Sequence, residues 1–348
     1  MYQLLERTMS KQIVSGNEHP LAVAGRVANG YAAANVFEDF LSRKADKTIA
    51  TYRRGLDVFG MYLADVGVTG VDGECLMSNP DCWQDVTWGI VEGFVRWMLD
   101  KGYAIATINH RLTAVKIFAK LASKAGALDK LEYLQIKDVT GYGRAEAKRI
   151  DARRDVTRVG RKKAHPVSLT PNQARQLRSQ PLDTPQGRRD ALLMCLLLEH
   201  GLRVGEAAGL TVDNFNLDAG ELTFYRPKVD KWQTHKLTPA TLAAARAYFQ
   251  HDAPDSGRAL LASRKGGSLI NRPMSTRAMT KRVNWLGRRL GIDGLSAHDC
   301  RHYWATDAAR NKTDLFSLQQ AGGWASLNMP RRYVEEAKIA NAGVKLSN

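Results

Sequence analysis

Residues 191–206, ALLMCLLLEHGLRVGE, contain the longest unbroken apolar run in the chain. This run, from Ala191 to Leu198, is eight residues long, whereas a membrane-spanning helix needs about 20 apolar residues. It therefore predicts a helix that is buried in the core of a globular domain. Gly201 is expected to end this helix, because glycine is common just after a helix terminus. A short second helix is expected to begin at once, around Arg203.

The sequence around this stretch predicts a mainly helical domain over residues 166–348 with one small antiparallel sheet. Thr170 and Pro171 have the preferred residue types for a helix N-cap and first turn. Residues 221–225 alternate in the manner of a strand, and residues 233–237 can pair with them across a turn at 228–231. Further helices are expected over residues 238–250, 275–290, 297–310 and 313–321, followed by a tail from residue 331.

An upstream helical domain is predicted over residues 34–136. Two sets of apolar residues recur at steps of three and four, so that each set lies on one helix face: Ile49, Tyr52, Leu56, Phe59 and Leu63, and then Ile108, Leu112, Val115, Ala119 and Ala122. Another helix is expected over residues 88–99. Residues 1–33 show little periodicity, and we interpret them as an N-terminal arm or as a loosely packed first helix.

The chain carries a strong positive charge. Its 348 residues include 51 Lys and Arg against 35 Asp and Glu, a formal net charge of +16, which favours a large acidic partner such as DNA. Residues 137–165 have almost no apolar periodicity and many basic residues, and they are expected to form a basic linker. The candidate DNA contacts are Arg53, Arg54, Arg111, Lys116, Lys120, Lys124, Lys162 and Lys163. For the ridge of Lys116, Lys120 and Lys124, the alternative is an ordinary solvated helix face.

Several other protein classes have no support in the sequence. The N-terminus lacks a basic start followed by an apolar segment, so no secretory signal is expected. The chain has four cysteines, Cys75, Cys82, Cys195 and Cys300. They show neither a disulfide framework nor a CxxC metal pair, which favours a reducing, cytoplasmic compartment. No zinc signature H-E-x-x-H and no phosphate-binding G-x-x-x-x-G-K-[ST] motif is present, so we expect neither a metal nor a nucleotide cofactor.

Three short blocks in the second domain need a common explanation: GLRVGE at 201–206, HDCRH at 298–302, and GGW at 322–324 with Tyr333 nine residues after Trp324. Each block alone is a weak signal. Their order and spacing resemble the tyrosine recombinases of the phage integrase family. In the first domain, TIATYRR at 48–54 and TINHRL at 107–112 are similar to the core-binding domain of that family. The resemblance covers roughly residues 35–348 and implies an N-terminal helical, SAM-like core-binding domain and a C-terminal mixed α/β catalytic domain.

The resemblance also implies roles for the residues of these blocks. Tyr333 would attack a DNA phosphodiester and form a 3′-phosphotyrosyl bond, and His298 would help to accept its proton. Arg203 and Arg301 would hold the negative charge that develops on the nonbridging oxygens, because guanidinium groups form forked, charge-assisted hydrogen bonds. Glu206 would support Arg203.

The roles of the hairpin lysines and of Trp324 stay open. The leaving 5′ oxygen needs a general acid, which is Lys228 or Lys231; Lys228 matches the first hairpin lysine of the family and is favoured. Trp324 stands where many members have a second histidine and where a Cre-like subset has tryptophan. Its indole N–H can donate a hydrogen bond but cannot transfer a proton as an imidazole does, and its ring can also pack against the helix that carries the nucleophile. His302 is expected to pack or to support its neighbours.

The implied function is site-specific DNA recombination on double-stranded target sites, in integration, excision or resolution. A homotetramer would exchange strands through a Holliday junction, with a monomer as the free state. The alternatives are a type IB topoisomerase-like strand transferase and a catalytically silent DNA-binding accessory protein. Val334, Ala337, Ala340 and Val344 form a short apolar stripe after the nucleophile, which would dock on its own domain or on a neighbouring protomer.

Overall fold

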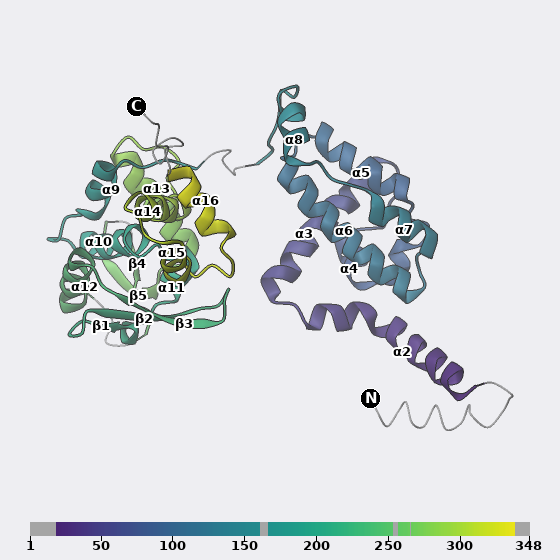
Figure 1. The fold of residues 1–348 in the computed structure, drawn as a ribbon, viewed down its shortest axis with the longest axis horizontal. Coiled ribbons are helices and arrows are strands. Elements are labelled where there is room, and N and C mark those ends of the chain that lie inside the picture. The colour runs from purple at the N-terminus through teal and green to yellow at the C-terminus, as the bar shows by residue number, and fades with distance from the viewer. Residues whose placement is uncertain (1–18, 161–165, 253–256, 265, 338–348) are drawn as a thin grey trace, which may run out of the picture. The chain divides into compact units, whose positions relative to one another are not determined.

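The computed structural model describes residues 19–160, 166–252, 257–264 and 266–337. The chain divides into two compact units, residues 1–162 and 163–348, and each has its own hydrophobic core (Figure 1). The first unit is helical, and the second combines helices with two small antiparallel sheets. The predicted fold class is therefore confirmed.

The first unit is built from helices whose apolar faces meet in one core. They are α2 (Pro20–Ser42), α3 (Asp46–Asp65), α4 (Gly73–Ser78), the 3-10 helix η1 (Pro80–Trp83), α5 (Trp88–Asp100), α6 (Ile105–Ala125), α7 (Lys130–Asp138) and α8 (Arg144–Asp151). The helices predicted over residues 46–63, 88–99 and 108–122 are confirmed as α3, α5 and α6. Leu56, Phe59 and Val115 are fully buried, as the three-and-four spacing predicts.

The described part of residues 1–33 is helical, in line with the alternative of a loosely packed first helix. α2 runs through the boundary expected at residue 33, and Phe37 in its second half meets Phe118 of α6 edge-on, with ring centroids 5.6 Å apart. Many small residues give α2 little amphipathic pattern, so its helical character was not visible as periodicity. Residues 1–18 of the expected arm lie outside the described residues.

Residues 137–159 pack on the first unit, although the sequence predicts a linker there. The Asn109 side chain exchanges two hydrogen bonds with the backbone of Tyr142, at 2.8 and 3.0 Å. The Arg154 guanidinium donates to the carbonyl oxygens of Leu99 and Tyr103, both at 3.1 Å. Polar anchors of this kind leave no trace in apolar periodicity, which is why the pattern alone indicates a tether. Residues 161–165 of the expected linker lie outside the described residues.

Cys75 and Cys82 are joined by a disulfide, which corrects the expectation of unpaired cysteines. α4 ends at Ser78 and η1 begins at Pro80, so the chain turns between the two cysteines and brings their Cα atoms to 6.0 Å. Such a local turn cannot be read from the cysteine spacing. Cys195 and Cys300 are free and buried in the second unit.

The second unit surrounds the apolar run with helices and a short sheet. Its elements are α9 (Pro171–Arg178), α10 (Pro185–Leu198), α11 (Val204–Gly209), η2 (Val212–Asn214), β1 (Phe215–Asn216), β2 (Glu221–Arg226), β3 (Lys231–Lys236), α12 (Pro239–His251), β4 (Leu261–Ser263), β5 (Leu269–Pro273), α13 (Thr276–Arg289), α14 (Ala297–Arg310), α15 (Leu315–Gly322) and α16 (Asn328–Ala337). Every side chain from Ala191 to Leu198 is at most 4% exposed, so the predicted buried helix is confirmed as part of α10.

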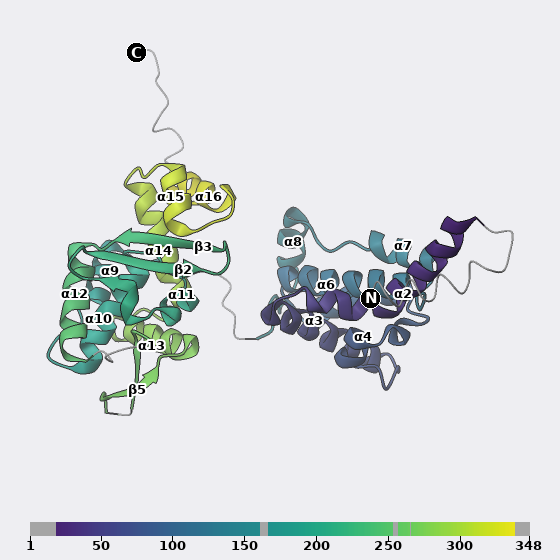
Figure 2. The same cartoon turned by 90° about the horizontal axis from the view of Figure 1, so that it is seen from below.

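The three-stranded sheet carries the β2–β3 hairpin, which the sequence predicts. The strands lie in the order β1-β2-β3, and Arg226 stands opposite Lys231 across the antiparallel pair. Cross-strand partners share one face of a sheet, so Lys231 and Gln233 lie on the face of Arg226 and Phe224. The Gln233 side chain of β3 donates to the carbonyl oxygen of Gln320 in α15 at 2.6 Å, so α15 lies next to this hairpin (Figure 2).

Two further observations complete the fold. The β4–β5 hairpin was not expected, because strands of three and five residues are too short to show a clear alternation. Across the described parts of both units, none of the helices combines the length and the apolar character that crossing a bilayer requires.

Candidate active site

Three arginines from different elements converge on the C-terminal end of α15. Arg203 directly precedes α11, Arg226 ends β2, and Arg301 belongs to α14. Their guanidinium groups donate to three consecutive carbonyl oxygens: Arg226 to Ala321 (2.7 Å) and Gly322 (3.0 Å), Arg301 to Gly322, and Arg203 to Gly323 (2.8 Å). The carbonyl end of a helix carries partial negative charge and so attracts cations. The turn at residues 321–323 therefore brings the three guanidinium groups together.

Arg226 is a site residue that the sequence analysis missed. Its side chain is fully buried and pairs with Glu206 at 3.0 Å. Gly323 has a φ of 59°, and a Cβ atom there would come within 2.4 Å of Arg226 Cδ, so this close approach requires glycine. A signal for Arg226 exists in the sequence, because it continues the buried alternation of Leu222 and Phe224. A charged residue on a buried strand face needs a partner, which points to a site.

The arginine cluster has more positive charge than its neighbouring carboxylate neutralises. Glu206 forms ion pairs with Arg203 (2.7 Å) and Arg226 (3.0 Å), and within the described residues no ion pair of Arg301 with a carboxylate is found. Burial, followed by repulsion from Arg203, lowers the pKa of Arg301 to about 9. Burial also lowers the pKa of Arg226 to about 10. A cluster that disfavours its own charge in this way favours a bound oxyanion.

Tyr333 lies next to this cluster, on α16. It is only 2% exposed, and its hydroxyl is 3.1 Å from Nδ1 of His302 on α14. The Tyr333 ring and the Arg301 guanidinium both lie against the ring of Trp324. His298 is exposed and meets the His302 ring edge-on, with centroids 4.6 Å apart. The structure thus brings the expected nucleophile, Arg301 and both histidines into one neighbourhood.

Trp324 packs between the arginine cluster and the nucleophile. The Arg301 guanidinium lies 4.5 Å from the centroid of the Trp324 ring, and the Tyr333 ring lies 5.8 Å away. Trp304 stacks on Trp324 at 6.0 Å. A Cβ atom on Gly322 would come within 1.9 Å of the Trp324 ring, so glycine is required beside it. Trp324 therefore fixes the positions of Arg301 and Tyr333 by packing.

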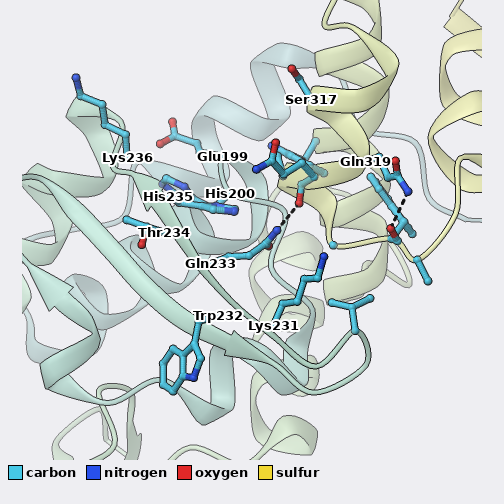
Figure 3. Close-up of a pocket in the computed structure, with 17 residues that line it drawn as sticks. Glu199, His200, Lys231, Trp232, Gln233, Thr234, His235, Lys236, Ser317 and Gln319 are labelled. Carbon is cyan, nitrogen blue, oxygen red and sulfur yellow. Dashed lines mark hydrogen bonds between the residues drawn. The ribbon is translucent and has the colours of Figure 1, made fainter.

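The two candidate lysines occupy different places on the hairpin. Lys231 begins β3 and lines an open cleft of about 980 Å³, together with Gln233, Gly323 and Trp324. Figure 3 shows Lys231 among the residues that line this cleft. Lys228 lies in the turn between the strands and is not among the lining residues. The hairpin register places Lys231 on the same sheet face as Arg226.

Two histidines, His200 and His235, line the cleft. Burial lowers the pKa of His235 to about 4, and this ring hydrogen-bonds the backbone of Ala321. His200 lies 5.8 Å from His235 and 3.1 Å from the hydroxyl of Thr241, and burial lowers its pKa to about 3. Both rings are therefore uncharged at neutral pH. His235 contacts the 321–323 turn at Ala321 without adding positive charge to the arginine cluster.

The expected lysine ridge of the first unit is only partly exposed. Lys120 and Lys124 face solvent, but Nζ of Lys116 donates to the carbonyl oxygen of Lys137 at 2.6 Å, and burial lowers its pKa. Because α7 covers this end of α6, Lys116 stabilises the fold of the unit. Lys162 and Lys163 lie outside the described residues.

The arginines of the first unit that were predicted to contact DNA also differ in their surroundings. Arg54 is exposed, whereas Arg53 forms an ion pair with Glu74. The Arg111 guanidinium lies 4.2 Å over the Tyr103 ring.

A basic surface that the sequence analysis did not single out lies on α13, where Arg277, Lys281, Arg288 and Arg289 are exposed beside Trp285. In the parts of the chain that the structure describes, no three His, Cys, Asp or Glu side chains gather as a metal site would require.

Comparison with known proteins identifies the family. Residues 167–339 match the model described as the Phage integrase family. The tyrosine recombinase XerD of Neisseria meningitidis serogroup B is 29% identical over 185 residues, which cover 51% of this chain and 62% of XerD. The tyrosine recombinase XerC of Roseiflexus castenholzii is 28% identical over 311 residues, which cover 85% of this chain and 87% of XerC.

Solved structures show the same fold. The Tn1549 transposon integrase in complex with transposon right end DNA has a TM-score of 0.61 and 15% identity, over 86% of this chain and 94% of the integrase. A lambda integrase dimer bound to a COC′ core site has a TM-score of 0.57 and 14% identity, over 96% of this chain and 85% of that protein. Together with the sequence matches, this fold shows that the chain belongs to the phage integrase family of tyrosine recombinases, the enzymes of site-specific DNA recombination.

Proposed function

We propose that this protein is a recombinase that cuts and rejoins DNA through a 3′-phosphotyrosyl bond to Tyr333. One observation carries the proposal: Arg203, Arg301 and Trp324 meet at the 321–323 turn, and Tyr333 lies against them. A phosphodiester bound here would supply the negative charge that Glu206 alone does not provide. The partner is a double-stranded target site, and the reaction uses no cofactor.

The chemistry follows from this arrangement. The oxygen of Tyr333 attacks the phosphorus, and Arg203 and Arg301 hold the charge on the nonbridging oxygens through forked hydrogen bonds. The 5′ oxygen leaves with a proton from a hairpin lysine. A 5′-hydroxyl of another strand then reverses the steps and releases Tyr333. Because the phosphotyrosyl ester conserves the energy of the broken bond, no nucleotide is consumed.

Covalent trapping on a nicked duplex tests this proposal. A target sequence is first selected by binding from a random-sequence duplex library and then nicked next to the cleavage position. Cleavage releases a short 5′-hydroxyl fragment, so the covalent adduct cannot reverse and is visible on a denaturing gel. We expect the wild-type protein to become attached to the 3′ end. Binding without any adduct would instead identify an accessory protein.

We further propose that strand exchange takes place between two sites within a tetramer. The free protein would be a monomer, and four copies on two paired sites would exchange strands in pairs through a Holliday junction. A plasmid with two selected sites should therefore yield deletion or inversion products and a branched intermediate. Relaxation of a supercoiled plasmid without such sites would favour a type IB topoisomerase-like activity. Residues 338–348, which include part of the expected docking stripe, lie outside the described residues.

Lys231 is expected to be the general acid, because it lines the cleft and shares a sheet face with Arg226. Lys231→Ala should slow cleavage of an ordinary substrate by about 10²- to 10⁴-fold. A substrate with sulfur in place of the bridging 5′ oxygen should restore cleavage, since a thiolate leaves without protonation. Lys228→Ala is the matched control and should cleave both substrates at similar rates. If the sulfur substrate instead restores cleavage selectively to Lys228→Ala, then Lys228 is the general acid.

Trp324 is expected to contribute both its ring and its N–H group. Trp324→His, which keeps an aromatic ring and a donor, should retain measurable cleavage. Trp324→Ala removes the surface on which Arg301 and Tyr333 pack, and it should be slower than the histidine variant by at least about tenfold. Trp324→Phe separates packing from donation, because it keeps only the ring. Equal single-turnover rates for the histidine and alanine variants would show that neither contribution matters.

A further inference from the structure

The ring of His302 has a nitrogen at hydrogen-bonding distance from the expected nucleophile, Tyr333. Its Nδ1 is 3.1 Å from the hydroxyl of Tyr333, and the two rings meet edge-on with centroids 5.3 Å apart. The phenol is 2% exposed, so this contact is shielded from bulk water. A hydrogen bond between neutral groups is stronger in such an environment than in water.

The position of His302 follows from the geometry of α14. Arg301 and His302 are adjacent, so they point in different directions from the helix: Arg301 donates to the α15 carbonyl end, and His302 meets α16. His298 lies one turn earlier on α14 and contacts the His302 ring. One short segment thus supplies both a phosphate ligand and the hydrogen-bond partner of the nucleophile.

We propose that His302 is a catalytic residue that accepts the hydroxyl proton of Tyr333 during DNA cleavage and returns it during rejoining. This inference rests on the proposed recombinase function. The O–H bond of Tyr333 breaks, and its proton moves to Nδ1 of a neutral ring that carries its hydrogen on Nε2, which gives an imidazolium. The phenol oxygen bonds to phosphorus, and the 5′ oxygen leaves with a proton from the hairpin lysine. In rejoining, both protons move back.

Among the described residues, Tyr333, His298 and Arg301 are titratable or charged groups that interact here. Tyr333 reaches His302 from α16, and His298 touches its ring from the same helix. Arg301, which interacts electrostatically with Tyr333, favours the phenolate over the phenol. Only the neutral form of His302 accepts the proton, so cleavage should rise with pH as this imidazole deprotonates.

Single-turnover adduct formation across pH 5 to about 8 tests the proposal on the full chain. His302→Phe keeps an aromatic ring, and His302→Asn places an amide near the position of Nδ1 without a transferable proton. Both variants should form the adduct about 10²-fold more slowly than wild type, with the acid limb of the rate profile removed. DNA affinity and the melting temperature show whether either variant still folds and binds. His251→Asn, at the exposed C-terminal end of α12, is the matched control and should keep both the rate and the acid limb.

Two results would overturn this role. One is a rate within about threefold of wild type in both His302 variants, which is below the usual effect of general base catalysis. The other is an acid limb that persists in the His302 variants and disappears in His298→Asn. Failure of the recombinase proposal looks different, because the wild-type protein itself would then form no adduct.

A second readout does not depend on activity. In the ¹⁵N-histidine spectrum of the DNA-free protein, Tyr333→Phe should shift the Nδ1 resonance of His302 toward the position of an imine nitrogen without a hydrogen bond. The His200 resonances should not move, because that ring bonds Thr241 instead. An unchanged His302 signal would contradict the proposed contact.

Discussion

Tyr333→Phe is expected to abolish covalent attachment to DNA while leaving DNA binding near the wild-type level. Phenylalanine keeps the ring that packs against Trp324 and His302, so the surroundings of the phosphate stay in place. Only the oxygen that would bond to phosphorus is lost. The loss of its hydrogen bond to His302 should change the free energy of unfolding by only about 1 kcal/mol. Trapping on the nicked duplex and a binding titration measure the two effects separately.

Tyr303→Phe is the matched control for this variant. Tyr303 is half-buried on α14 and packs against the core of the same unit, so its hydroxyl has no part in the proposed reaction. This variant should form the adduct as wild type does. Residual adduct formation by Tyr333→Phe would show that the nucleophile is another residue. Loss of the adduct in Tyr303→Phe alone would lead to the same conclusion.

Periodicity predicted the helices whose faces are buried in a core. The spacing of Leu56, Phe59 and Leu63 and the apolar run in α10 reflect burial directly, so α3 and α10 appear in the structure where the sequence places them. Residues 137–159 are held in part by Asn109 and Arg154, which bond backbone groups. A hydrogen bond from one side chain to a distant backbone has no period, so this attachment requires the structure.

The spacing of the motifs predicted which residues form the candidate site, but it did not predict the contacts between them. Arg203, Arg301, Trp324 and Tyr333 stand in blocks that resemble a known family, and the structure brings them together. The contact between His302 and Tyr333 joins residues 31 apart in sequence and depends on how α14 and α16 pack. The choice between Lys228 and Lys231 depends on the register of the hairpin, which a single sequence does not define.

Arg301→Lys is expected to slow cleavage by at least about 10²-fold, because removing a partner of the transition-state charge has effects of that size. Lysine keeps a positive charge but loses the planar fork that bonds two oxygens at once. Arg301 also donates to the carbonyl oxygens of Gly201 and Gly322, and lysine can satisfy only part of this buried set. Arg301→Ala should therefore be at least as slow in cleavage and less stable than Arg301→Lys.

The control must separate the lost phosphate contact from a general loss of stability. Arg188→Lys serves this purpose, because Arg188 bonds both carboxylate oxygens of Asp252 with little exposure and lies outside the arginine cluster. We expect Arg188→Lys to lower the melting temperature but to cleave at the wild-type rate when measured well below that temperature. Arg301→Lys should instead lose much of its single-turnover cleavage rate at the same temperature, while its DNA affinity stays unchanged. If Arg301→Lys cleaves as fast as Arg188→Lys, then Arg301 stabilises the 321–323 turn and does not hold the reacting phosphate.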